Sequence, residues 1–294
     1  MFGIHDGLIQ KALIIFLCQN YSVICVKNKK GNHHFMRYFI HLAYRGTAYR
    51  GWQRQANLGS SVQQVLENTL GKMTGKTIGF MGCGRTDAGV HAIQYFGHFD
   101  YEETWTYDPI ERLNRMLPKD ISVYELIPVH DRAHSRYDAE KRSYEYHLHT
   151  EINPFLAPVS SFYNNITSLD IDAMKIATEG LKNLTDFRHL CLTPDKFNNT
   201  FCIMHEAEIL VSDNGKQLCF RFTANRFLRS MIRIMVSRLL ALGQGEISLD
   251  EFNDTSRNNQ SFMFRTLAFP EGLHLSRVVY PYLERVPKRF LLLG

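Results

Sequence analysis

The sequence lacks the patterns that mark most metal and disulfide proteins. Its six cysteines include no Cys-x-x-Cys pair, and its 13 histidines include no His-Glu-x-x-His motif. These absences argue against a zinc knuckle, a compact disulfide scaffold and a zinc metalloprotease. His147 and His149 could share one face of a strand, and His130 and His134 one face of a helix, but no third ligand is near either pair in sequence. We therefore expect no metal site, surface positions for these histidines, and a reducing compartment.

A long apolar run is also missing from the first 35 residues. Residues 12–18 are apolar, but this stretch is far shorter than the roughly 20 residues that span a bilayer. The flank before it is barely basic and no small-x-small cleavage site follows cleanly, so a signal peptide is poorly supported. We expect residues 1–35 to be an extension, the working protein to begin near Met36, and no membrane association.

Composition sets broad limits on the class of protein. The 294 residues allow one large domain or two ordinary ones, and a 45% apolar and 21% charged composition is ordinary for a globular protein. The formal net charge of +5 permits a polyanionic partner without requiring one.

Hydrophobic periodicity and turn signals predict an α+β fold. Strands are expected at 39–44, 77–81, 91–99, 121–129, 142–149, 206–211, 217–222 and 274–280. Helices are expected after Ser61, after Asp108, after Asp170 or Asp172, and from Phe227 to Leu242. Because strands and helices do not alternate strictly, a doubly wound sheet is disfavoured. We expect an N-terminal half at 36–138, a C-terminal half at 139–285 and a tail at 286–294.

A glycine-flanked loop at residues 84–89 carries an arginine and a carboxylate. Gly84 and Gly89 allow unusual backbone angles and close approach to a ligand. Between them, Asp87 beside Arg85 has two interpretations. It is either part of a structural salt bridge or Asx turn, or an ionised nucleophile or base held by a cation.

The run from Gly84 to Ala92 resembles the active-site signature of the tRNA pseudouridine synthase A family, with nine contiguous matching positions. Nine positions are far more specific than a lone glycine motif. Further segments resemble the family's other motifs: 51–55 (Gly-Trp-Gln-Arg-Gln), 61–63, 142–146 (Arg-Ser-Tyr-Glu-Tyr), 225–233 and 272–275. The resemblance runs from about Met36 to about Tyr282.

This resemblance implies an isomerase that converts uridine to pseudouridine at positions 38, 39 and 40 of the tRNA anticodon stem-loop. It implies two similar mixed α/β domains, with antiparallel sheets joined across a positively charged RNA-binding cleft, in a cytoplasmic homodimer. The reaction involves no redox step and imports no group, so neither a metal nor an organic cofactor is expected.

The resemblance also assigns roles to individual residues. Asp87 is the nucleophile, and the sequence leaves open whether it attacks the base or the sugar. Arg233 is the cation that favours its ionised form, and Tyr144 contacts the target base and could move a proton. The target base must leave its stack. Arg85 either fills the gap or pairs with Asp87.

Further residues are candidate RNA contacts. On a helix beginning near Arg226, a rotation of about 100° per residue places Arg226, Arg229 and Arg233 in one narrow sector. A basic stripe is usually a solvated face, but this one includes the expected partner of Asp87, so we expect phosphate contacts from it. The other candidates are Trp52, Arg54, His134, Arg136 and Leu273.

Two alternatives remain at this point. One is an RNA-binding paralogue with weakened catalysis, because Arg45 and Leu190 depart from the family pattern outside the expected site. The other is a nucleoside or glycoside hydrolase, which would need a second carboxylate in a comparable motif. The sequence shows no such second carboxylate.

Overall fold

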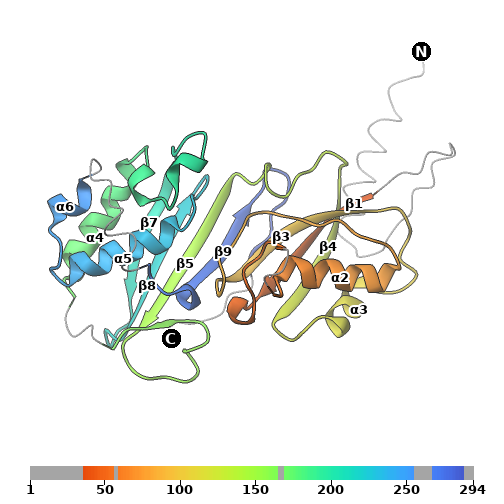
Figure 1. Ribbon diagram of the computed structural model, residues 1–294, viewed down its shortest axis with the longest axis horizontal. Helices are drawn as coiled ribbons and strands as arrows, with labels where there is room; N and C mark the ends of the chain where they lie inside the picture. Colours follow the sequence, from red (N-terminus) through yellow and green to blue (C-terminus); the bar gives the residue numbers. More distant parts are fainter. Residues whose placement is uncertain (1–35, 56–58, 165–168, 255–266, 288–294) are drawn as a thin grey trace, which may run out of the picture.

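A computed structural model describes residues 36–55, 59–164, 169–254 and 267–287. The expected extension at 1–35 and most of the expected tail therefore lie outside the described residues. The fold mixes helices with one large sheet, in agreement with the α+β prediction (Figure 1). None of the helices in these ranges is long and apolar enough to cross a bilayer.

Strands from both halves of the sequence form a single nine-stranded sheet. Its main path runs β4-β1-β3-β9-β5-β8-β7, with short β2 beside β3 and short β6 beside β5. The bounds are β1 Met36–Tyr44, β2 Met81–Gly82, β3 His91–Tyr101, β4 Ile121–Val129, β5 Lys141–His149, β6 Ser161–Phe162, β7 Met204–Val211, β8 Gln217–Ala224 and β9 Leu273–Val279. The main-path strands pair antiparallel, except that β9 runs parallel to β3.

The parallel junction between β3 and β9 is short, with two pairs of facing residues. A buried side chain extends it. Gln94 on β3 accepts a hydrogen bond from the backbone of Val278 at 2.9 Å and donates one to the carbonyl of Arg285 at 3.1 Å. Because Gln94 is fully buried, its amide groups satisfy backbone polar groups that water could not reach.

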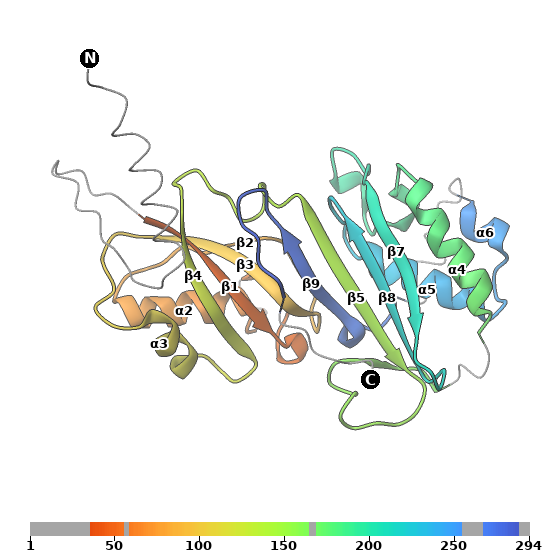
Figure 2. The ribbon, with the colours of Figure 1, turned by 180° about the vertical axis from the view of Figure 1, so that it is seen from behind.

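The helices are α2 Val62–Thr74, α3 Pro109–Met116, α4 Ile171–Gly180, α5 Met231–Gly243 and α6 Leu249–Asn253. All of these helices except α5 begin where a local side chain caps them. Ser61, Asp108 and Asp170 cap the first three as predicted, each accepting from a backbone N–H of the first turn. Gly75, at a φ of 71°, ends α2. Helices α2 and α5 lie over the same face of the sheet, in front of the strands in Figure 1 and behind them in Figure 2.

Two local predictions are wrong, and one possible helix is not formed. Of the strand predicted at 77–81, only Met81 pairs, together with Gly82 against β3. The segment with His130 and His134 forms turns rather than a helix. His147 and His149 are buried on β5 instead of lying at the surface, where His147 packs against His274 and His149 against Phe162.

Candidate active site

The loop that carries Asp87 is fastened to the segment after β1. The hydroxyl groups of Tyr44 and Thr86 are 2.8 Å apart, and the backbone N–H of Trp52 donates to the carbonyl of Thr86 at 3.1 Å. Gly51, at a φ of +87°, lies so close that a Cβ there would be 2.6 Å from the same carbonyl. A side chain at position 51 would therefore displace the loop.

Two donors from around the start of α5 hold the carboxylate of Asp87. Ser230 Oγ donates to Asp87 Oδ2 at 3.2 Å, and Arg233 Nη1 forms an ion pair with the same oxygen at 3.3 Å. Arg233 Nε also donates to the carbonyl of Ala268 at 2.7 Å, which fixes its guanidinium group. Within the described part of the chain, no hydrogen bond reaches Oδ1. The Asp87 side chain as a whole is 40% exposed.

The predicted start of this helix is wrong, and the correction affects two arginines. Helix α5 begins at Met231, because Ser230 adopts left-handed backbone angles with a φ of 56°. Arg226 and Arg229 therefore precede the helix, and of the expected stripe only Arg233 lies on it. The turn places Ser230 Oγ beside Asp87, at the positive end of the helix dipole.

Tyr144 lies on β5 with only 9% of its surface exposed. Its ring packs edge-on against Phe227, with centroids 5.1 Å apart, and the register with β9 shifts between Ser143 and Tyr144. Such irregularities re-aim side chains next to functional sites. Burial raises the pKa of Tyr144 well above that of free tyrosine, and the nearby Asp87 adds to the rise. At neutral pH the hydroxyl keeps its proton and can donate it in a hydrogen bond.

Arg142 joins the two parts of the site, a role that the sequence did not reveal. Its guanidinium group donates to four backbone carbonyls. They belong to Cys83 (2.8 Å), Arg136 (2.8 Å), Ala139 (3.3 Å) and Asn225 (3.4 Å). The bond to Cys83 ties the Asp87 loop to β5, and the bond to Asn225 ties the segment before α5 to the same strand. Arg142 therefore positions all three elements that carry the site.

Comparison with known proteins identifies the family. A family model described as tRNA pseudouridine synthase matches residues 180–281. The tRNA pseudouridine synthase A of Porphyromonas gingivalis is 36% identical over 250 residues, covering 83% of this chain and 97% of the relative. The protein of that name from Bacteroides fragilis is 39% identical over 247 residues, covering 83% and 96%. The chain belongs to the tRNA pseudouridine synthase A family.

In this family member, several exposed arginines lie close in sequence to groups that are bonded at the site. Arg85 is in the loop itself and donates to Gln53 Oε1 at 3.1 Å. Among the described residues, Arg85 forms no ion pair with Asp87, whose carboxylate pairs with Arg233 instead. Arg229 directly precedes Ser230, and Arg136 offers its carbonyl to Arg142. Arg54, two residues after Trp52, pairs with Glu67 at 2.9 Å. Each of these cations is one or two residues from a group bonded to the site.

Other expected RNA contacts are less accessible. Trp52 is 2% exposed and stacks on Tyr95, with ring centroids 3.9 Å apart. It therefore belongs to the core, and we do not propose it as an RNA contact. Leu273 is buried at the start of β9. His134 is half-buried, and its Nδ1 accepts from the backbone of Arg136 at 3.1 Å. Arg226 is half-buried and donates to Asn199 at 3.3 Å.

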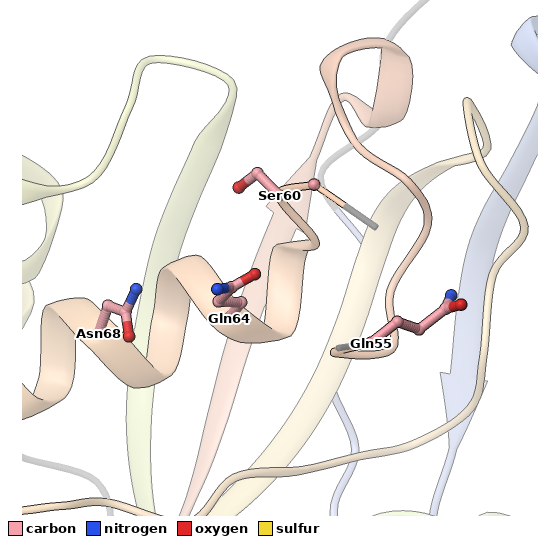
Figure 3. A pocket seen from close by; sticks show the side chains of 5 residues that line it. Gln55, Ser60, Gln64 and Asn68 are labelled. Carbon is pink, nitrogen blue, oxygen red and sulfur yellow. The ribbon is translucent and has the colours of Figure 1, made fainter. Parts of the chain in front are cut away.

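A polar hollow beside the start of α2 was not predicted. Its lining consists of Gln55, Gly59, Ser60, Gln64 and Asn68. Figure 3 shows Gln64 and Asn68 along α2, Ser60 on the segment that leads into the helix, and Gln55 across from them. Uncharged amides of this kind donate and accept hydrogen bonds, and Arg54 adjoins Gln55 in sequence. The hollow therefore presents neutral polar groups next in sequence to Arg54.

Proposed function

We propose that this chain isomerises uridine to pseudouridine in tRNA, the activity that its relatives' names state. The observation that carries the proposal is the carboxylate of Asp87. One oxygen is fixed by Ser230 and Arg233, and the other receives no hydrogen bond from the described residues, with the protonated hydroxyl of Tyr144 nearby. A paralogue without catalysis would have no need of this ion pair.

The reaction conserves every atom of the substrate. The bond from N1 of uracil to C1′ of the ribose breaks, a bond from C5 to C1′ forms, C5 loses a proton and N1 gains one. Oδ1 of Asp87 would form a bond either to the electrophilic C6 of the base or to C1′ of the sugar. That bond breaks again when the product is released. The carboxylate is regenerated, so a single nucleophile suffices.

Each neighbour has a distinct part in this scheme. Arg233 and Ser230 hold Oδ2, and this contact keeps the carboxylate aimed and favours its charged form. Tyr144 donates a hydrogen bond to the detached uracil while the base turns. Leu273 provides apolar contact with it. Water must be kept from C1′ while the glycosidic bond is open, and the buried ring of Tyr144 contributes to that exclusion.

The target and assembly follow the family pattern in our proposal. The targets are uridines 38, 39 and 40 of the anticodon stem-loop, and Arg85 occupies the space left by the extruded base, whose removal costs a few kcal/mol. Arg54, Arg136, Arg226 and Arg229 contact phosphates in a positively charged cleft between domains that meet near Ala139. The enzyme acts as a homodimer in the cytoplasm.

The decisive experiment uses an unmodified tRNA transcript with uridine at position 39. Incubation with the protein should yield pseudouridine, detected by chemical labelling because the isomerisation leaves the mass unchanged. Replacing uridines 38 to 40 with cytidine should abolish the label. Label persisting after the replacement would contradict the proposed target alone. Binding of the transcript without any label would support the catalytically weakened paralogue.

The arginines around the site should make tRNA binding strongly dependent on salt. With the four proposed phosphate contacts, affinity should fall roughly 100-fold between about 50 and 200 mM salt. Replacing Arg226 and Arg229 together with alanine should reduce the slope of log K against log salt by roughly 1.5. Filter binding across a salt series measures both. Arg115→Ala, on α3 and paired with Glu111, should leave the slope unchanged. An equal loss there would show a diffuse effect of net charge.

A further inference from the structure

A second group of chemistry-bearing side chains lies on the opposite face of the sheet from Tyr144. Side chains alternate along a strand, so Glu145 and His147 point away from the face that carries Tyr144. Cys219 on β8 is the residue directly paired with His147. Strand pairing therefore brings together a carboxylate, an imidazole and a thiol, although the cysteine is 72 residues away in sequence.

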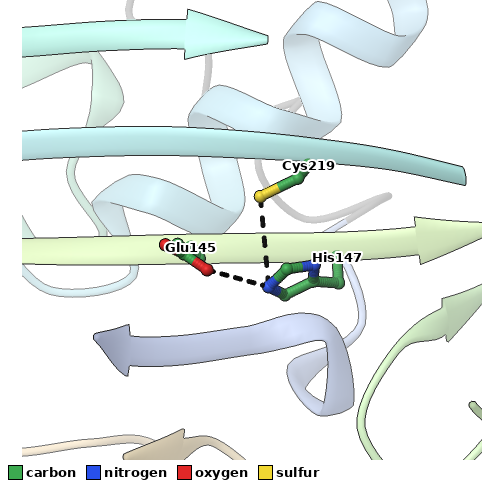
Figure 4. A group of neighbouring side chains, drawn as sticks. All are labelled: Glu145, His147 and Cys219. Atoms are coloured by element: carbon green, nitrogen blue, oxygen red, sulfur yellow. Dashed lines mark hydrogen bonds and ion pairs between the residues drawn. The ribbon is translucent and has the colours of Figure 1, made fainter. Parts of the chain in front are cut away.

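The carboxylate and the thiol both approach the same ring nitrogen of His147. His147 Nε2 is 3.2 Å from Glu145 Oε2 and 4.0 Å from Cys219 Sγ, and all three ligand atoms lie within 4.8 Å of one another. Figure 4 shows both interactions meeting at that nitrogen. In a tetrahedral zinc site, Zn–N and Zn–O distances of about 2.0 Å and Zn–S of about 2.3 Å place ligands roughly 3.3 to 3.6 Å apart. The Nε2–Oε2 separation already satisfies this geometry, and Cys219 Sγ must move closer to the other two ligand atoms to complete it.

The same geometry excludes a nucleophilic relay. A Cys-His-carboxylate relay needs both ring nitrogens, one facing the thiol and the other the carboxylate. Here the thiol and the carboxylate both face Nε2, whereas Nδ1 is buried with no hydrogen-bond partner in the described structure. Only 5% of the surface of His147 is exposed, so its polar atoms are held out of water. A single nitrogen that both the thiol and the carboxylate approach suits a shared metal ion better than proton transfer.

The surrounding charges are compatible with a cation. A thiolate and a carboxylate together neutralise a divalent ion. Arg221 lies nearby, but its Nε is 3.3 Å from Glu145 Oε1, the oxygen that does not face His147. Its Nη1 pairs with Glu208 at 3.2 Å. Arg221 therefore orients the carboxylate and leaves Oε2 facing His147, as groups around metal ligands commonly do. Its charge also lies beside Cys219, where it favours the thiolate form.

We propose that Glu145, His147 and Cys219 bind one zinc ion, with solvent as the fourth ligand on the side of the half-buried Glu145. Binding displaces the thiol proton to solvent and joins Zn²⁺ to the sulfur. The ion links β5 to β8 on the face away from Asp87. The site is therefore structural, and its existence does not depend on the proposed reaction.

Cobalt is the probe for this site, because Co²⁺ bound to a thiolate has a charge-transfer band in the near ultraviolet. The full chain, stripped with EDTA and kept reduced by a phosphine, should bind one Co²⁺ with that band, and Zn²⁺ should displace it. Cys219→Ser should abolish the band and weaken zinc binding by more than about 100-fold. Cys202→Ser, at another buried free cysteine in the same half, should change neither.

Thermal unfolding provides a second readout. Zinc in 100-fold excess over its dissociation constant should raise the Tm of the parent chain and of Cys202→Ser, but not that of Cys219→Ser. Circular dichroism of the metal-free variants verifies that both are folded. Should Cys219→Ser misfold, Glu145→Gln gives the same test of affinity at a more exposed ligand. Absence of saturable binding, or equal binding by Cys219→Ser, would overturn the proposal.

Discussion

Replacing Asp87 with asparagine should abolish pseudouridine formation, with kcat reduced about 1,000-fold or more. Asparagine keeps the shape of the side chain and can still bond Ser230, but it has no charged oxygen to form the covalent bond. The measurement is single-turnover conversion of a tRNA transcript. Affinity for tRNA should stay within a few-fold, because the exposed arginines that we propose as phosphate contacts are unchanged.

Asp213→Asn is the matched control for Asp87→Asn. It makes the same chemical change in the turn between β7 and β8, far along the chain from the site. This variant should convert tRNA at the parent rate. Turnover retained by Asp87→Asn would mean that another group is the nucleophile. Loss of both turnover and tRNA binding would instead indicate a displaced loop.

Replacing Arg233 with glutamine should lower kcat about 100-fold. The change removes the cation paired with Asp87 Oδ2. It also removes the Nε donor that bonds the carbonyl of Ala268 and so holds the arginine side chain in place. A hydrogen bond to a charged group contributes about 1.5–3 kcal/mol, and each 1.36 kcal/mol corresponds to a tenfold change in rate. Arg233→Lys should recover part of the loss, since one ammonium group restores the charge but cannot reach both acceptors.

The pattern across kcat and KM tests whether Arg233 acts on the carboxylate or on tRNA. Action on Asp87 predicts a fall in kcat with little change in KM. Arg277→Gln, at an exposed arginine on β9, should alter neither constant. An increase in KM alone for Arg233→Gln would reassign Arg233 to phosphate binding.

Local patterns predicted much of the fold and the centre of the site. Strand β4 matches its predicted bounds of 121–129, because alternation and flanking turns define it within the segment itself. The caps Ser61, Asp108 and Asp170 were predictable because each acts within three residues. The loop at 84–89 was found through its nine-residue motif, and the structure places Arg233 beside Asp87. The expected ion pair is therefore present.

The sequence failed where distant contacts decide the local structure. The run from Asn225 to Arg233 has helical spacing and no glycine or proline. The backbone of Ser230 nevertheless adopts left-handed angles, and its side chain bonds Asp87, 143 residues away in the chain. Trp52 has polar neighbours in sequence, but its ring fits into the core against Tyr95. The link from His147 to Cys219 likewise arises only from strand pairing.

The order of strands also bears on how the protein is made. Strand β9, at 273–279, lies in the middle of the sheet between β3 and β5, although it follows both in the chain. During synthesis, the ribosome must complete this strand before the inner edges of β3 and β5 can be covered. Until then both edges are open to pairing with other chains. Long-range pairing of this kind folds slowly, so the sheet that joins β3 to β5 is completed only after β9 has been synthesised. A chaperone that shields strand edges would raise the yield of folded protein.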